Sequence, residues 1–279
     1  MAKLPKNIKE IIVRLIDIIA QLEKIKDRER YDWIIKYLMS QQIKPSIHSY
    51  KTGKNIFIKS RSYPFIGIGS HYDTVPLTPG ANDNASAIVV CLELAQRLKR
   101  NPLKNLGCEI YFFDEEEKGL LGSMAWIEEK GLKGMLGFLN MEMVGSGDQF
   151  AIWPVREEKQ TPLLRTFEQN AKKLGIPTHR IDRIVMNTAD HESFNIAGME
   201  DAFTISCICE KDLEVAYHYY RALEFEVSHQ TLYEIMSQAP IFEHYHQASD
   251  RSVNLSETSL QMTVDAIWES LQDMDANYR

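Results

Sequence analysis

The chain has 279 residues, of which 44% are hydrophobic and 25% charged, and its formal net charge is −7. This balance is that of an ordinary globular protein and excludes a disordered, collagen-like or disulfide-scaffold chain. No apolar run approaches the ~20 residues of a membrane-spanning helix, and the negative charge argues against nucleic-acid binding, which requires a basic face. We therefore expect neither a membrane nor a nucleic acid as partner.

The predicted elements begin with a helical stretch over about residues 6–40. Apolar residues recur every three or four positions between Ile11 and Leu22, which is typical of an amphipathic helix. A membrane-surface helix is an alternative interpretation, because the polar face carries lysines and arginines, but acidic residues dilute that face. Charged residues also interrupt the apolar core that a secretory signal needs. The four cysteines show no zinc-site spacing, so free thiols are expected, as in a cytoplasmic protein.

Strands and helices then alternate along the chain. Short extended runs are predicted near 43–50 and 55–59. Compact apolar runs predict buried strands, at 64–71, 108–113, 134–145 and 202–209. Helix-periodic apolar residues predict helices between them, at 85–98, about 121–130, 162–174 and 256–274.

This alternation predicts an α/β fold, a three-layer sandwich in which helices flank a mixed, largely parallel central sheet. No linker and no internal repeat separates two domains, so residues 1–279 are expected to form a single domain with the N-terminal amphipathic helix packed on it. In such sheets ligands bind beyond the carboxyl ends of the strands. Three predicted strands end in ionisable clusters, at 71–73, 114–117 and Glu142.

Each polar cluster has an ordinary interpretation when it is taken alone. His71 and Asp73 could be a surface pair at a strand end, although residues two apart in an extended segment project to one side, so that the carboxylate can orient the imidazole. Asp83 and its neighbouring asparagines could cap the helix that follows. The acids of 114–117 could be a solvated run, and the two histidines of 243–250 could belong to a polar loop.

Together the clusters indicate a metal site. Adjacent acids at the end of a buried strand repel one another unless cations neutralise them, and Glu142, alone in an apolar strand, needs a partner if it is buried. One or two histidines with several carboxylates, and no cysteine, suit zinc, manganese or cobalt. A carboxylate shared by two ions, with a free acid nearby, makes a two-metal hydrolytic site. The residues by themselves therefore predict a metal-dependent hydrolase with a binuclear centre.

The order of the motifs resembles that of the dizinc exopeptidases of the bacterial leucyl aminopeptidase type, in peptidase clan MH. Glutamate carboxypeptidases and glutaminyl cyclases are relatives in the same family. The shared motifs are an H-x-D pair, GANDNAS, an E-E pair before GLLGS, an N-x-[DE]-M-x-G strand end and a final Y-H-x-x-x-D. All five occur in this order between residues 69 and 250.

The resemblance implies a set of metal ligands. His71 and Glu142 would bind one zinc ion, His246 and Glu117 would bind the other, and Asp83 would bridge the two. Many aminopeptidases of this type have Asp where this chain has Glu142, and the longer arm would change how that ion is held. Two zinc ions are thus the implied cofactors, with cobalt or manganese as substitutes.

The resemblance also implies roles in the reaction. Glu116 looks like the general base, and Asp73 resembles the acid that supports His71. Some members have a catalytic tyrosine where this chain has Met199; others have one before the final histidine, so Tyr245 would help to stabilise the oxyanion. The segment that begins with Asp190 and His191 would line the site without binding metal.

The implied activity is that of an aminopeptidase, which hydrolyses the N-terminal bond of a peptide with a water that bridges two zinc ions. A two-zinc carboxypeptidase or deacylase and a glutaminyl cyclase-like enzyme are alternatives, as is a non-catalytic metal-binding protein on the same fold. Only 24 residues separate Glu117 from Glu142, which leaves no room there for the inserted domain of two-domain relatives. The substrate pocket is expected to come partly from the loops 153–160 and 182–190.

Overall fold

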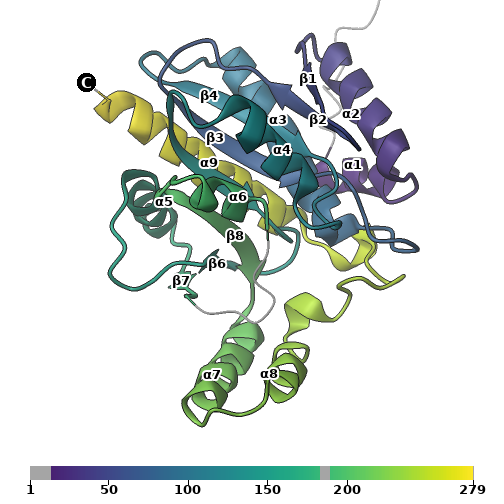
Figure 1. The fold of residues 1–279 in the computed structure, drawn as a ribbon, viewed down its shortest axis with the longest axis vertical. Helices are drawn as coiled ribbons and strands as arrows, with labels where there is room; N and C mark the ends of the chain where they lie inside the picture. Colours follow the sequence, from purple (N-terminus) through teal and green to yellow (C-terminus); the bar gives the residue numbers. More distant parts are fainter. Residues whose placement is uncertain (1–13, 183–188, 279) are drawn as a thin grey trace, which may run out of the picture.

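The computed structural model describes residues 14–182 and 189–278 of the chain. A sheet of eight strands runs through this part of the protein (Figure 1). From one edge to the other, its strands are β1 (Ser46–Ser49), β2 (Lys54–Ile58), β4 (Gly107–Phe113), β3 (Phe65–His71), β5 (Met135–Met141), β8 (Ala202–Ile208), β6 (Gln149–Trp153) and β7 (Thr178–Arg180).

The centre of the sheet is parallel. β3 pairs in parallel with both β4 and β5, and β5 pairs in parallel with β8. The register places Gly69 of β3 opposite Tyr111 of β4 and Asn140 of β5, so the carboxyl ends of these strands meet at one edge. Antiparallel pairing joins β1 to β2, β2 to β4 and β6 to β8.

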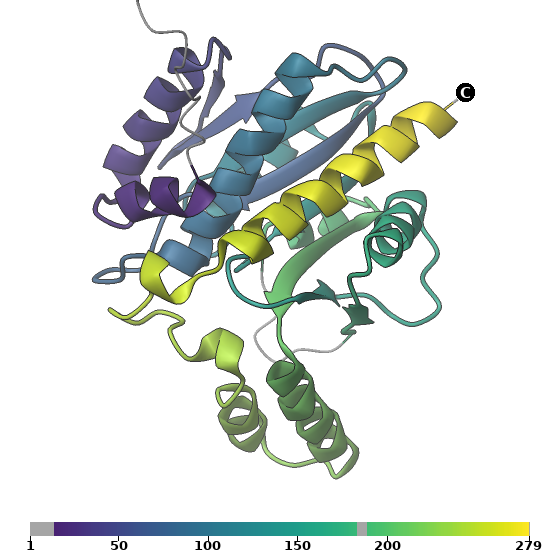
Figure 2. The same ribbon diagram turned by 180° about the vertical axis from the view of Figure 1, so that it is seen from behind.

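Helices cover both faces of the sheet, as Figures 1 and 2 show from opposite sides. On one face lie α3 (Ser86–Arg100), α5 (Pro162–Lys173) and α9 (Glu257–Asn277), and on the other lie α4 (Leu121–Lys130) and α6 (His191–Ile196). The predicted α/β sandwich with a mixed central sheet is therefore confirmed. That residues 1–279 form one domain stays a prediction.

The N-terminal stretch forms two helices, α1 (Leu15–Leu22) and α2 (Asp27–Ser40), where one helical segment over about 6–40 was predicted. Residues 6–13 of that prediction lie outside the described residues. The break has a local cause, because the Glu29 carboxylate accepts the backbone N–H of Lys26 and so starts a new helix. α1 contacts both α3 and α9.

An aromatic layer fills the space between the sheet and the helices α4 and α6. Phe138 of β5 stacks on Phe194 of α6 with 3.7 Å between the ring centroids, and Phe113 of β4 lies at the edge of both rings. A Cβ atom at Gly69 of β3 would lie 2.5 Å from the Phe138 ring, so the strand can pass beneath this ring only without a side chain. Burying a phenylalanine side chain stabilises the fold by about 2–3 kcal/mol.

The helices α7 (Glu210–Glu224) and α8 (His229–Met236) form a hairpin that projects from the body of the protein (Figures 1 and 2). The short turns η2 (Pro240–Phe242) and η3 (Ser252–Asn254) return the chain to α9. The sequence analysis did not predict α6, α7, α8, β6 or β7. Among the described helices, none combines the length and the apolar character that crossing a membrane requires.

Candidate metal centre

The five residues predicted to bind metal come from five separate segments. His71 ends β3, and Glu142 follows the last residue of β5. Glu117 lies in the turn after β4, Asp83 lies in the π-helical turn η1 (Ala81–Ala85) before α3, and His246 lies in the loop after η2. The structure brings all five together at the edge where the parallel strands end, and their roles as ligands stay predictions.

Asp83 stands between the two histidines. Its Oδ1 lies 3.2 Å from Nε2 of His71, and its Oδ2 lies 3.3 Å from Nε2 of His246. His71 Nε2 is also 2.8 Å from Oε1 of Glu142, and His246 Nε2 is 3.2 Å from Oε2 of Glu117. The five side chains thus form two groups that share one carboxylate.

The donor set fits divalent metal ions. Imidazoles and carboxylates without a thiolate suit zinc, cobalt or manganese, and the candidate ligand atoms in each of the two groups lie within 4.8 Å of one another. Glu117 Oε1 is buried without a hydrogen-bond partner among the described residues. Within residues 14–182 and 189–278, only histidines form ion pairs with these carboxylates. A buried cluster with this excess of negative charge requires cations.

Asp73 supports the centre in two ways. Nδ1 of His71 lies 3.3 Å from Oδ1 of Asp73 and 3.2 Å from its backbone oxygen, so this nitrogen carries the proton and Nε2 is left as a ligand. The same carboxylate accepts the backbone N–H groups of Glu116 and Glu117, at 3.1 and 3.2 Å. The sequence predicted the first contact, whereas the second depends on the tertiary fold.

The turn that carries Asp83 is held by a residue to which the sequence analysis gave no role. Both carboxylate oxygens of Asp250 accept backbone N–H groups, from Asn82 at 2.7 Å and from Asp83 at 3.1 Å. On the other side of the turn, the Asn82 side chain accepts the N–H of Gly145, which fixes the turn to the segment after β5. The backbone at Asp83 is therefore positioned from two directions.

Arg30 of α2 is a second supporting residue that the sequence analysis missed. Its side chain is completely buried and its guanidinium donates to the backbone oxygens of Pro79 at 2.5 Å and Gly80 at 2.9 Å. Gly80 has a φ of +61°, and a Cβ atom there would lie 2.6 Å from the backbone oxygen of Asp83. Burial lowers the pKa of Arg30 to about 10, so the group remains a cation at neutral pH.

The grouped side chains shift one another's pKa values. Burial alone would lower the pKa of His246, but hydrogen bonds to Asp83 and Glu117 raise it to about 9. Burial would raise the pKa of Asp83, but hydrogen bonds from His246 and His71 hold it well below its usual range. Burial raises the pKa of Glu142 to about 7, although His71 opposes the shift.

Glu116, the predicted general base, lies at the edge of this cluster. Its Oε2 is 4.0 Å from Nε2 of His71, farther than Glu142 Oε1. Burial raises the pKa of Glu116 well above its usual range; the His71 charge opposes this shift, and the Glu142 charge adds to it. A carboxylate with a raised pKa that is not tied by a short ion pair can accept a proton.

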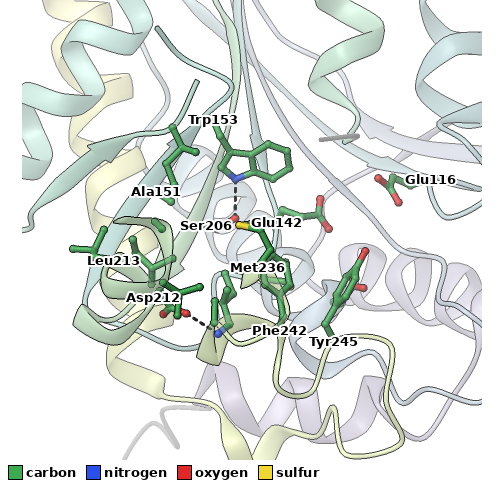
Figure 3. A pocket seen from close by; sticks show the side chains of 18 of the residues that line it. Glu116, Glu142, Ala151, Trp153, Ser206, Asp212, Leu213, Met236, Phe242 and Tyr245 are labelled. Atoms are coloured by element: carbon green, nitrogen blue, oxygen red, sulfur yellow. Dashed lines mark hydrogen bonds between the residues drawn. The ribbon is translucent and has the colours of Figure 1, made fainter. Parts of the chain in front are cut away.

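Tyr245, the predicted oxyanion donor, lies between the cluster and a pocket (Figure 3). Its ring stacks on the His246 ring with 3.7 Å between the centroids. Burial and the nearby carboxylates raise the pKa of Tyr245, so its hydroxyl keeps its proton at neutral pH and can donate a hydrogen bond.

The three other residues named from the resemblance are buried. His191 Nδ1 lies 2.6 Å from the Thr204 hydroxyl, and burial lowers the pKa of His191 to about 3, so the ring stays neutral. Burial raises the pKa of Asp190 to about 7. Met199 packs in the aromatic layer with Phe194.

An apolar pocket opens beside the carboxylates (Figure 3). Trp153 forms one wall, and its indole N–H donates to the Ser206 hydroxyl at 3.0 Å. The Asp212 carboxylate accepts the backbone N–H groups of Ile241 and Cys209, both at 2.8 Å, and so ties η2 to the start of α7. Further apolar lining comes from strands β6 and β8, from α7 and α8 and from η2, including Ala151, Ile208, Leu213, Met236 and Phe242.

The first of the two loops predicted to contribute to the pocket supplies one of its lining residues. From 153–160 only Trp153 lines the described pocket, and residues 183–188 of the second predicted loop lie outside the described residues. The larger part of the wall comes from 206–245, because α7 begins just after the carboxyl end of β8 and η2 contacts both α7 and β8. Trp153 thus supplies part of the wall as expected, and the contribution of 182–190 stays a prediction.

Comparisons of sequence identify related proteins. The family model described as "Peptidase family M28" matches residues 57–271. Aminopeptidase YwaD of Bacillus subtilis is 32% identical over 176 residues, which are 58% of this chain and 36% of the relative. The probable lipoprotein aminopeptidase LpqL of Mycobacterium tuberculosis is 27% identical over 236 residues, which are 77% of this chain and 44% of the relative.

Solved structures share the fold. The zinc aminopeptidase BSAP from Bacillus subtilis matches with a TM-score of 0.59 at 24% identity, over 79% of this chain and 50% of that chain. Glutaminyl cyclase from Porphyromonas gingivalis matches with a TM-score of 0.68 at 19% identity, over 94% of this chain and 97% of that chain. At these identities the likeness concerns the fold alone.

This chain spans less than half the length of the two curated relatives named above. The segment that matches the family model nevertheless covers more than half of this chain, and it contains all five of the grouped histidines and carboxylates. The chain therefore belongs to peptidase family M28.

Proposed function

We propose that this protein is a zinc-dependent aminopeptidase that hydrolyses the N-terminal peptide bond of peptides. One observation carries the proposal: two groups of candidate ligands share Asp83 at the mouth of an apolar pocket. Membership of family M28 supports a peptidase, and the named aminopeptidase relatives support this class of substrate.

The charges around the site favour an aminopeptidase over a carboxypeptidase. Of the described residues that line the pocket, several are carboxylates, including Asp83, Glu116 and Glu117, and none is lysine or arginine. A carboxypeptidase needs a cation to bind the free carboxylate at the end of its substrate. The described lining offers no such cation, and the metal ions would neutralise Asp83, Glu117 and Glu142, so it is the lack of lysine and arginine that favours an aminopeptidase.

The metal ions would occupy the two groups of ligands. His71, Asp83 and Glu142 would hold one zinc ion, and Asp83, Glu117 and His246 would hold the other. Cobalt or manganese suits the same donors. When bound, the ions would supply Lewis-acid chemistry, which polarises a carbonyl group and makes a water a nucleophile near neutral pH.

The side chains of this protein would move the protons and bind the substrate. Glu116 accepts a proton from the attacking water and delivers it to the leaving amine, a role that suits its raised pKa. The Tyr245 hydroxyl donates a hydrogen bond to the developing oxyanion. Asp73 keeps the proton on Nδ1 of His71, so that Nε2 faces the metal.

The pocket would receive the first side chain of the peptide. One wall is apolar and buried, since Ala151, Trp153 and Ile208 are all less than 10% exposed. Burial of a leucine or phenylalanine side chain there contributes about 1.5–3 kcal/mol to binding. We therefore propose large apolar residues as the preferred N-terminal residues.

The test uses the full chain loaded with zinc. We expect hydrolysis of the p-nitroanilides of leucine and phenylalanine, no hydrolysis of N-acetyl-leucine p-nitroanilide, and two zinc ions per chain by elemental analysis. Cleavage of an N-blocked peptide from its free carboxyl end would indicate a carboxypeptidase instead. Cyclisation of a peptide with N-terminal glutamine would indicate a glutaminyl cyclase-like enzyme, and bound zinc without turnover would indicate a metal-binding protein. The cytoplasmic location stays a prediction.

A further inference from the structure

A second recess borders the ligand cluster, as the apolar pocket does. The pocket and the recess share Glu116, Glu117 and Tyr245 among their described lining residues. Both therefore border the place where the scissile bond would lie. A bound peptide would put its side chains on both sides of this place, one in the pocket and one in the recess.

The exposed fractions of the lining side chains indicate which substrate residue the pocket binds and which one the recess binds. The pocket is the more buried of the two, with Trp153 only 7% exposed, whereas in the recess Met124 is 50% exposed and Ile196 is 74% exposed. An exopeptidase binds the end of its substrate, so the terminal residue belongs in the more buried pocket. The rest of the peptide must leave toward solvent, which places the second residue in the open recess.

One carboxylate in the recess has an oxygen without a hydrogen-bond partner among the described residues. Glu192, in the first turn of α6, is partly buried, and its Oε2 is buried without a hydrogen-bond partner among the described residues. Lys118, which precedes the lining residue Gly119 in the chain, pairs instead with Glu115 at 2.9 Å. A buried carboxylate oxygen without a donor carries a desolvation cost that an incoming cation would relieve.

Apolar side chains stand beside this carboxylate. Ile196 lies four residues after Glu192 on the same face of α6, and Met124 comes from α4, which packs against α6. A lysine or arginine side chain combines an apolar stem with a cationic head. Such a side chain matches the recess, because its stem would lie on Met124 and Ile196 while its head reaches Glu192.

We propose that Glu192 makes the enzyme prefer peptides with lysine or arginine as the second residue. This inference rests on the proposed aminopeptidase function and adds a specificity on the leaving side of the scissile bond. None of the described residues that line the recess is a lysine or arginine, and of its acids Glu116, Glu117 and Glu192 only Glu192 has no role at the metal centre. A second residue with a negative side chain would therefore be repelled.

The experiment compares the tripeptides Leu-Lys-Ala, Leu-Gln-Ala and Leu-Glu-Ala, with amidated carboxyl ends, on the zinc-loaded full chain. We expect kcat/KM to be about tenfold higher for the lysine peptide than for the glutamate peptide, because an attraction replaces a repulsion of similar size. The ratio should fall as salt rises from about 0.05 to about 0.5 M, since the recess is open to solvent.

Variants assign the preference to the side chain. In Glu192→Gln, which keeps the size of the side chain, the lysine-to-glutamate ratio should fall at least about threefold. Glu200→Gln is the matched control, because Glu200 is exposed and does not line the recess; its ratio should equal that of the wild type. Hydrolysis with equal rates for the three peptides, or a ratio unchanged in Glu192→Gln, would overturn this inference alone. Failure to hydrolyse any of them with zinc bound would overturn the proposed function, and this inference with it.

Discussion

Replacing Asp250 by asparagine tests how the turn that carries Asp83 is held. Asp250 is 2% exposed, and its two oxygens accept the backbone N–H groups of Asn82 and Asp83. An asparagine side chain offers only one acceptor oxygen, so its amide nitrogen would face one of these N–H groups. The variant would thus leave two buried donors opposed to each other beside the metal centre.

The expected magnitude follows from these contacts. A hydrogen bond to a charged group stabilises a protein by about 1.5–3 kcal/mol, and a buried group left without a partner costs about 1–3 kcal/mol. Part of this loss is offset, because burial raises the pKa of Asp250 and the native charge is itself costly. We therefore expect Asp250→Asn to lower the free energy of unfolding by about 2–4 kcal/mol, or Tm by about 3–7 °C at this chain length.

The assay has two readouts. Thermal unfolding of the metal-free variant reports stability, and competition with a zinc chelator reports affinity, which should fall for both ions because Asp83 belongs to both ligand groups. Asp32→Asn, at an exposed position of α2, is the control and should change neither quantity. An unchanged Tm, or a lowered Tm with unchanged zinc affinity, would refute the view that Asp250 positions Asp83.

Three further predictions concern the metal centre and its reaction. Removal of zinc with a chelator should lower Tm, because Asp83, Glu117 and Glu142 then repel one another, and added zinc should restore it; a Tm that does not move would contradict the site. Glu116→Gln should lower kcat by about 100-fold or more while zinc content stays unchanged, and turnover near that of the wild type would exclude Glu116 as the base. Because the metal-free protein holds the pKa of His246 at about 9, zinc must displace a proton, so its affinity should rise up to about tenfold per pH unit until pH 9. In the metal-free protein the stabilisation from His246 is complete below its unfolded pKa of about 6.5 and is lost as pH rises through 9. A zinc affinity and a metal-free Tm that both stay constant between pH 6 and 9.5 would contradict this prediction.

The positions of the ligand segments could be predicted from the sequence because local patterns report strand ends. The apolar runs before His71 and before the acids at 114–117 predicted buried strands, and parallel strands place their carboxyl ends at one edge. Glu142 stood out for the same reason, as a charge at the end of an apolar run. The order of the motifs then supplied roles that spacing alone did not.

The supporting contacts could not be predicted in this way, because they join segments far apart in the chain. Asp250 and Asp83 are 167 residues apart, and nothing in the local pattern of either indicates the other. The pocket wall was missed for a different reason. The helices α7 and α8 project from the body, and their buried side chains are few, namely Asp212 and Tyr219 in α7 and Leu232 in α8, while large side chains such as Tyr217 are exposed.

The buried guanidinium of Arg30 has a consequence for anyone who trims this protein. The match to the family model starts at residue 57. Arg30, which donates hydrogen bonds to the backbone oxygens of Pro79 and Gly80 before Asp83, lies in α2, upstream of that boundary. A recombinant fragment that begins at residue 57 would keep every candidate ligand but would lack Arg30, which supports the turn that carries Asp83. A fragment that keeps this support must therefore include Arg30 of α2. A boundary chosen from the family match alone would remove it.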